Sequence, residues 1–99
     1  MLNKGDQVYI IIEKFKEDYH YDLIKAVIKN VPRGNLKEYD LIEHGNIYCR
    51  KRKGIYLSRE EAVEKAEEMA DRYDHTWEGI MGRKMKRVWR EDNLYAENN

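Results

Sequence analysis

Three histidines and one cysteine are the side chains of this 99-residue chain best suited to nucleophilic or general acid–base chemistry. His20, His44 and His75 lie far apart, and none belongs to a metal-ligand pattern such as His-Glu-x-x-His. Cys49 has no neighbouring histidine, so we expect a small core residue rather than a nucleophile. The six glycines are scattered and form no phosphate-binding loop. The sequence therefore predicts no catalytic residue, no bound metal and no cofactor.

The segment Asp18-Tyr19-His20-Tyr21-Asp22 places two carboxylates and an imidazole within five residues. In an extended chain, Asp18, His20 and Asp22 point to one side, as metal ligands would. We nevertheless expect a polar loop between two strands. Tyr19 and Tyr21 then project from the other side as exposed aromatic residues that can contact a protein partner.

Basic residues gather at 50–53 and again at 83–90, a pattern that nucleic-acid-binding proteins share. Trp89 and several tyrosines could stack on bases. The sequence pI of about 6.8 argues against this reading, because a dedicated nucleic-acid domain usually exceeds about 9. Nucleic acid is therefore the alternative partner, through Arg50, Lys51, Arg52, Lys53, Arg83, Lys84, Lys86, Arg87 and Arg90.

Residues 79–90 combine an apolar edge with five cations and no acid. Methionine and tryptophan are both favoured at adaptable protein interfaces. A projecting segment would be the best docking surface of the chain, for a protein partner or for a second copy. A segment that folds back on the sheet would instead place the same residues in the core. The predicted partner-binding residues are Met81, Met85, Val88, Trp89, Tyr19 and Tyr21.

The elements that position these residues begin with strands. Residues 7–13 are apolar on both faces, as in a strand that is central or covered by a helix. Residues 22–31 alternate and end in Val31-Pro32-Arg33-Gly34, which suits a type I turn. Two further strands, 36–43 and 46–53, meet around Gly45-Asn46, a two-residue hairpin loop. With a short strand at 55–57, the pattern predicts five antiparallel strands.

An amphipathic helix follows. Ser58 and Glu61 form a capping box, in which each side chain satisfies a free amide of the first turn. Gly79 and Gly82 predict a kink or break, followed by a short second helix that ends near Arg90. At about 100° per residue, one face carries the apolar residues, namely Ala62, Val63, Ala66, Met69, Ala70, Tyr73, Trp77, Ile80 and Met81.

Composition limits the class of protein. With 41% hydrophobic and 11% aromatic residues, the chain can form a core, and its length fits one domain. We expect this domain to have a sheet part at 1–57, a helical part at 58–90 and a tail at 91–99. Lys+Arg 19 balances Asp+Glu 19, but residues 58–78 hold 3 basic and 8 acidic groups, whereas residues 79–90 hold 5 basic groups. A single cysteine forms no internal disulfide, and no apolar run approaches the ~20 residues of a membrane span. We expect a soluble, cytoplasmic protein with no membrane partner.

The run Tyr56-Leu57-Ser58-Arg59-Glu60-Glu61-Ala62 opens a helix after short strands that begin at Gly5-Asp6-Gln7-Val8-Tyr9. This arrangement, over residues 5–70, resembles small proteins of Gram-positive phages and mobile elements. The resemblance implies an SH3-like barrel with a trailing helix, and some small phage proteins of this size block host defence nucleases. It assigns no functional residue, because the shared motif is structural.

We therefore predict an α+β protein: a small five-stranded antiparallel sheet or SH3-like barrel, followed by an amphipathic helix that is kinked or broken near Gly79-Gly82. The predicted function is a non-enzymatic protein-interaction or inhibitor module; the resemblance further implies that it is phage-encoded and directed at a host defence protein in the host cytoplasm. The first alternative is a nucleic-acid-binding barrel. The second is a small-molecule-binding (sponge) protein with a pocket between sheet and helix.

Overall fold

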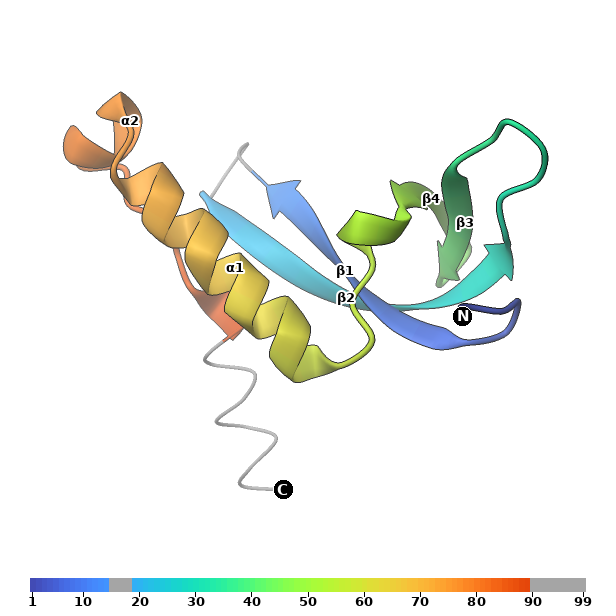
Figure 1. Cartoon of the computed structure of the whole chain (residues 1–99). Coiled ribbons are helices and arrows are strands. Elements are labelled where there is room, and N and C mark those ends of the chain that lie inside the picture. Colours follow the sequence, from blue (N-terminus) through green and yellow to red (C-terminus); the bar gives the residue numbers. More distant parts are fainter. Residues whose placement is uncertain (15–18, 90–99) are drawn as a thin grey trace, which may run out of the picture. The chain divides into compact units, whose positions relative to one another are not determined.

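The computed structural model describes residues 1–14 and 19–89. It confirms the α+β class: four strands form one sheet in the order β1-β2-β3-β4, and helices follow them (Figure 1). The elements are β1 (Gln7–Lys14), β2 (His20–Asn30), β3 (Glu38–Glu43), β4 (Asn46–Lys51), the 3-10 turn η1 (Arg52–Gly54), α1 (Arg59–Asp74) and α2 (Trp77–Ile80).

The chain divides into two compact units, and the division does not follow the predicted boundary between sheet and helix. The first unit comprises Met1–Ile10 and Ile24–Ala62, and the second comprises Ile11–Leu23 and Val63–Asn99. Both β1 and β2 therefore contribute one part to each unit. Each unit is described below by itself.

In the first unit, the predicted fifth strand is reduced to a single bridge. Tyr56 pairs with Tyr9 through two backbone hydrogen bonds of 2.8 and 2.9 Å. Just before it, η1 turns the chain, and the Arg52 guanidinium donates to the Ile55 carbonyl at 2.9 Å. The predicted strand 46–53 ends at Lys51 for this reason, and the sheet of the described residues has four strands.

The hairpin between β3 and β4 turns one residue earlier than predicted. His44 and Gly45, not Gly45 and Asn46, occupy the loop, with φ of 48° and 81°. Positive φ at both central residues is the type I′ geometry, which matches the twist of an antiparallel pair. Glu43 consequently pairs with Asn46, and Asp40 pairs with Cys49.

The turn between β2 and β3, in contrast, lies further along the chain than predicted. The Leu36 amide donates to the Arg33 carbonyl at 3.0 Å, and Gly34 has a φ of 56°. Pro32 therefore precedes the tight turn instead of occupying its second position. The alternation predicted for β2 is confirmed, since Ala26 and Ile28 are buried while Lys25 and Lys29 are exposed. The buried apolar residues of the first unit are Leu2, Val8, Ile10, Ala26, Ile28, Leu41, Ile55 and Ala62.

The capping box that begins α1 is confirmed. The Glu61 amide donates to Ser58 Oγ at 3.2 Å. The Glu61 carboxylate in turn accepts from the Leu57 amide at 3.1 Å, one residue before the predicted partner. Two amides at the start of the helix thus gain acceptors, which fixes where α1 begins.

The second unit has its own core, in which α1 packs on the adjoining parts of β1 and β2. Ala66 and Ala70 are fully buried on the predicted apolar face of α1. They cluster with Tyr21 of β2 and with two residues from the end of the described chain, Met85 and Trp89. Partly buried residues packed against this cluster are Ile11, Tyr19, Leu23, Val63, Met69, Tyr73 and Val88.

The helix ends earlier than predicted. α1 stops at Asp74 instead of continuing to Glu78, and α2 starts a separate turn at Trp77. The apolar stripe predicted to run on to Met81 is therefore interrupted at His75 and Thr76. Residues beyond this break no longer share the buried face of α1.

Candidate functional site

The short helix α2 lies beyond the C-terminal end of α1 (Figure 1). Hydrogen bonds hold its backbone at both ends. At its start, Thr76 Oγ1 accepts from the Gly79 amide at 3.4 Å and donates to the Tyr73 carbonyl at 2.6 Å. At its end, the Arg83 amide donates to Glu78 O and the Gly82 amide to Gly79 O, each at 3.2 Å. With Gly82 at a φ of 106°, this pair of bonds is a Schellman motif.

Gly79 brings α2 against the end of α1. It is buried, and a Cβ built there would lie 2.6 Å from Asp74 Cα, Asp74 O and Tyr73 O. Such distances leave no space for any side chain. The backbone contact therefore requires glycine and holds α2 in place.

Three large apolar side chains on this turn face solvent. Trp77, Ile80 and Met81 are 75%, 67% and 66% exposed. Their spacing of i, i+3 and i+4 places them on one side of the helical turn. We call these three residues the α2 knob.

A shallow cavity of about 290 Å³, widely open to solvent, lies next to the start of α2 in the same unit as the knob. Tyr21, Met69 and Tyr73 supply apolar wall, Thr76 lies at one side, and Glu13 and Arg72 add opposite charges. Desolvation raises the pKa of the Tyr21 hydroxyl, with a further contribution from Glu13. Desolvation and a 3.0 Å hydrogen bond to Glu78 raise the pKa of the Tyr73 hydroxyl to about 12. The hydroxyls of Tyr21 and Tyr73 are therefore both neutral near pH 7.

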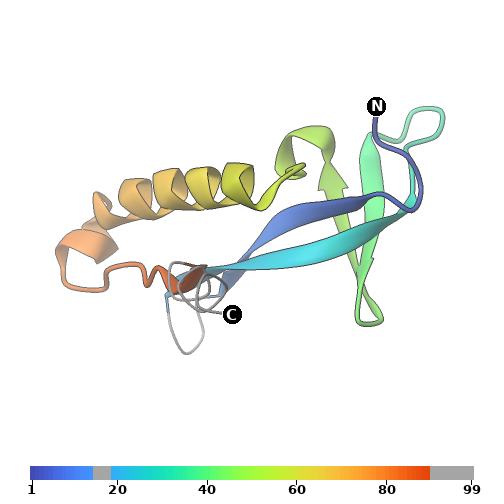
Figure 2. The same ribbon diagram turned by 90° about the horizontal axis from the view of Figure 1, so that it is seen from below.

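Residues 83–89, the C-terminal strap, run back along α1 (Figure 2). Met85 and Trp89 were predicted as partner-binding residues, but they are 3% and 0% exposed. They belong to the core of the second unit, the outcome that sequence alone left open. Val88 is half-buried against the same core, and of the predicted apolar edge only Met81 is exposed.

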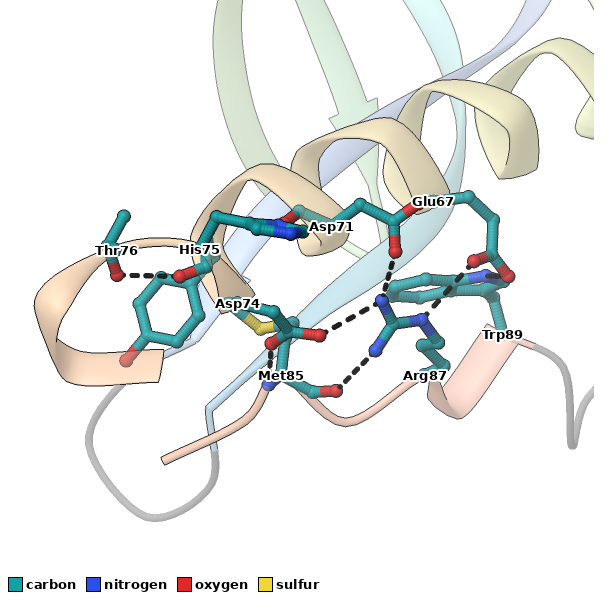
Figure 3. Close-up of polar contacts among 9 residues, drawn as sticks. Glu67, Asp71, Asp74, His75, Thr76, Met85, Arg87 and Trp89 are labelled. Atoms are coloured by element: carbon teal, nitrogen blue, oxygen red, sulfur yellow. Dashed lines mark hydrogen bonds and ion pairs between the residues drawn. The ribbon is translucent and has the colours of Figure 1, made fainter. Parts of the chain in front are cut away.

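Figure 3 shows the polar contacts that fasten the strap to α1. Arg87 pairs with Glu67 at 3.3 Å, Asp71 at 2.5 Å and Asp74 at 3.1 Å. Trp89 Nε1 donates to Glu67 at 3.0 Å, since α1 presents this carboxylate toward the indole.

Asp74 also accepts the Met85 amide, at 2.8 Å. Partial burial of Asp74 favours its neutral form, but the Met85 N–H and the Arg87 guanidinium together lower the pKa of this carboxyl below 3.8. The strap is thus held by charged hydrogen bonds around its buried side chains.

The predicted aromatic pair is also partly buried. Tyr21 is in the core, so its predicted exposure is wrong. Tyr19 is half-buried, with its ring centroid 5.7 Å from that of Tyr73. Arg83 lies over the Tyr19 ring at 5.5 Å and donates to its hydroxyl at 2.8 Å.

The predicted nucleic-acid residues lie in different units and have varied surroundings. In the second unit, Arg87 is engaged with three carboxylates, while Lys84 and Lys86 are exposed. Arg90 lies outside the described residues. In the first unit, the Arg50 guanidinium lies 5.9 Å from the Tyr48 ring, Arg52 bonds to Ile55 O, and Lys51 and Lys53 are exposed.

Cys49 is not the core residue that the sequence suggested. It is exposed on β4, and its Sγ donates to Asp40 Oδ1 at 3.2 Å. That hydrogen bond raises the pKa of the thiol, which disfavours the nucleophilic thiolate. Asp40 also accepts from Asn30 at 3.2 Å, and all three residues line an open cavity of about 450 Å³.

Among residues 1–14 and 19–89, no group of three or more His, Cys, Asp or Glu side chains could hold a metal ion. Asp18, which the sequence analysis placed with His20 and Asp22 in a polar loop, lies outside these ranges. His20 is half-buried on β2, with Nδ1 buried and lacking a hydrogen-bond partner. In the same ranges, no helix has the length and apolar character to cross a membrane.

Comparison with known proteins adds no relative. No family model matches the chain, and neither a curated protein nor a solved structure is significantly similar to it.

Proposed function

We propose that this chain is a non-enzymatic protein-interaction module that docks through the α2 knob. The observation that carries the proposal is the exposure of Trp77, Ile80 and Met81, at 75%, 67% and 66%, on a turn with a fixed backbone. Large exposed apolar clusters on small proteins commonly mark interaction sites. The i, i+3, i+4 spacing is also the anchor pattern of helices that bind in apolar grooves.

The energetics favour this role. Burying three such side chains contributes about 1.5–3 kcal/mol each. The Thr76 cap and the Schellman motif order the turn before binding, so a partner loses little of that energy to ordering the backbone. Tryptophan is in addition one of the commonest hot-spot residues of protein interfaces.

The charges near the knob indicate which class of partner surface would bind it. Arg83, Lys84 and Lys86 follow the knob in the chain, whereas the two nearby acids are already engaged, Asp74 by the Met85 amide and Arg87, and Glu78 by the Tyr73 hydroxyl. A protein groove with an apolar floor and an acidic rim complements this surface. The resemblance to phage proteins implies that the target is a host protein and that binding inhibits it. The SH3-like barrel is also a prediction of that resemblance.

The test is affinity capture with matched variants. The wild-type chain, Trp77→Ser/Ile80→Ser and the control Leu36→Ser/Leu57→Ser are immobilised and exposed to nuclease-treated and untreated lysate. Leu36 and Leu57 are also exposed, at 71% and 53%, but belong to the first unit. We expect the wild-type chain and the control to capture a protein partner that the knob variant does not capture. Nuclease treatment of the lysate should not change this capture.

Two outcomes contradict the proposal. Capture that the knob variant retains in full would assign docking to another surface. Capture that nuclease abolishes would favour the nucleic-acid alternative, which further predicts binding that falls with salt by about 0.7–0.9 in log K per log unit of salt for each phosphate neutralised.

A further inference from the structure

We propose that the α2 knob also docks on a second copy of this chain, with Trp77 of each copy entering the cavity beside Tyr21, Met69 and Tyr73 of the other. This inference rests on the docking role proposed above for the knob. It adds a named partner, a receiving site and a symmetric geometry.

The cavity suits an indole. It is open to solvent, its volume is about 290 Å³, and Tyr21, Met69 and Tyr73 are among the residues that line it. Aromatic pairs and sulfur–aromatic contacts both favour insertion of a tryptophan ring. Arg72 also lines the cavity, where its guanidinium pairs with Glu68 and stays largely exposed, so it can contact an inserted ring as well.

The position of the cavity suits a two-fold axis. Thr76 lines it and is directly followed by Trp77 in the chain, so donor and receiver are neighbours at one end of α1. In the proposed dimer, two copies meet at this end and each Trp77 enters the cavity of the other copy. Self-complementary patches of this kind form isologous dimers, the commonest symmetric assembly.

Electrostatics permit the encounter. The formal net charge of the chain at pH 7 is +0, so net charge does not repel two copies, although an isologous contact brings Arg83, Lys84 and Lys86 of both copies toward one another and keeps the dimer weak. Proteins near zero net charge associate more readily than highly charged ones. At short range, Glu13 of the cavity and Lys84 beyond the knob carry opposite charges.

The expected dimer is weak. The largest apolar patch on a typical monomer covers roughly 300–600 Å², and if the knob is of that size two copies bury about 600–1,200 Å² in total. That is the low end of specific interfaces, which corresponds to transient complexes. Self-association then covers the knob at high concentration, and a heterologous partner has to compete for it.

Sedimentation velocity on the whole chain tests the dimer, over about 1 µM to 500 µM, a range that brackets micromolar dissociation constants. We expect the mass to rise from 12.0 kDa toward twice that value in wild type and in the control Leu57→Ala. Trp77→Ala, at an exposed position, should weaken association at least about tenfold, as truncating a hot-spot anchor does. A mass of one chain throughout the range, or an unweakened Trp77→Ala dimer, overturns the inference.

Methyl NMR tests the receiving site. The Met69 methyl resonance should shift with concentration, because the incoming indole exerts a ring current on it, and it should stay fixed in Trp77→Ala. Doubling of the mass without a shift at Met69 would overturn the cavity assignment. A monomeric chain with knob-dependent capture refutes this inference alone, whereas a knob-dependent dimer that captures nothing refutes the proposed function alone.

Discussion

Trp89 Nε1 donates a 3.0 Å hydrogen bond to Glu67 Oε1, and the whole Trp89 side chain is removed from solvent. This contact joins two residues 22 positions apart and fastens the C-terminal strap to α1. It also decides between the two roles that sequence left open for the strap. The aromatic residue that looked most suitable for docking stabilises the second unit instead, and the exposed tryptophan is Trp77.

The first prediction concerns Trp89. Trp89→Ala should lower the free energy of unfolding by about 3–5 kcal/mol, because it removes a fully buried side chain and leaves a cavity. Trp89→Phe should cost less, since it keeps most of the apolar contact and loses the bond to Glu67. Denaturant titration followed by circular dichroism measures both. Little change in stability for Trp89→Ala would show that the side chain is not part of the core.

The second prediction concerns pH. The pKa of Asp74 is lowered in the folded state by the Met85 amide and Arg87, in spite of partial burial. A depressed carboxyl pKa stabilises the fold fully above its unfolded value, and this contribution is lost as pH falls through the folded-state value. The free energy of unfolding should therefore decline below pH 3.8.

Asp74→Asn isolates this contribution. The stability difference between wild type and Asp74→Asn should be constant at neutral pH and shrink below 3.8. Asp71→Asn is the matched control, because Asp71 also pairs with Arg87 but its side chain is 66% exposed. A variant difference that does not change with pH would show that the Asp74 charge contributes nothing to stability.

The third prediction concerns the backbone contact of α2. Gly79→Ala should destabilise the protein by about 1–3 kcal/mol, because its Cβ overlaps the backbone of Asp74 and Tyr73 and α2 must shift. Gly54→Ala is the control: its Cβ meets nothing closer than Arg50 Cδ at 3.6 Å. Unfolding curves should show a change within about 0.5 kcal/mol for the control. Equal stability of the two variants would mean that α2 does not pack as described.

Sequence predicted the elements that local rules determine. The capping box of Ser58 and Glu61 and the alanine face of α1 depend on residues within one or two turns, so both could be recognised. The alternation of β2 is equally local. The sequence did not reveal the end of α1. Thr76 caps a separate turn, and the close packing of Gly79 on the backbone of Tyr73 and Asp74 exists only in the folded chain.

The hairpin illustrates why cross-strand contacts were missed. Placing the loop at Gly45-Asn46 instead of His44-Gly45 shifts the register of β4 against β3 by two residues. The pairing of Asp40 with Cys49, and hence the thiol–carboxylate hydrogen bond, follows only from the observed register. Strand alternation places Cys49 with Ile47 correctly, but it does not tell which face is covered, and both residues are exposed.

The proposed docking site shows the same limit. Of the residues predicted to bind a partner, Met81 also belongs to the α2 knob, whereas the sequence assigned Trp77 and Ile80 to the buried face of one long helix. Because α1 ends at Asp74, Trp77 and Ile80 are exposed to solvent. The carboxylates of α1 pair with Arg87, and the neighbouring Met85 and Trp89 pack in the core of the second unit. These outcomes depend on contacts between segments distant in sequence, which periodicity does not encode.

The measurement that tests the central claim most directly is photo-crosslinking from the α2 knob. A benzophenone amino acid replaces Ile80 in one chain and, as the control, Leu57 in another; both positions are exposed, at 67% and 53%. We predict a discrete covalent adduct with a polypeptide from position 80, either a second copy or another protein, and none from position 57. Absence of a position-80 adduct, or equal adducts from both positions, would contradict the account.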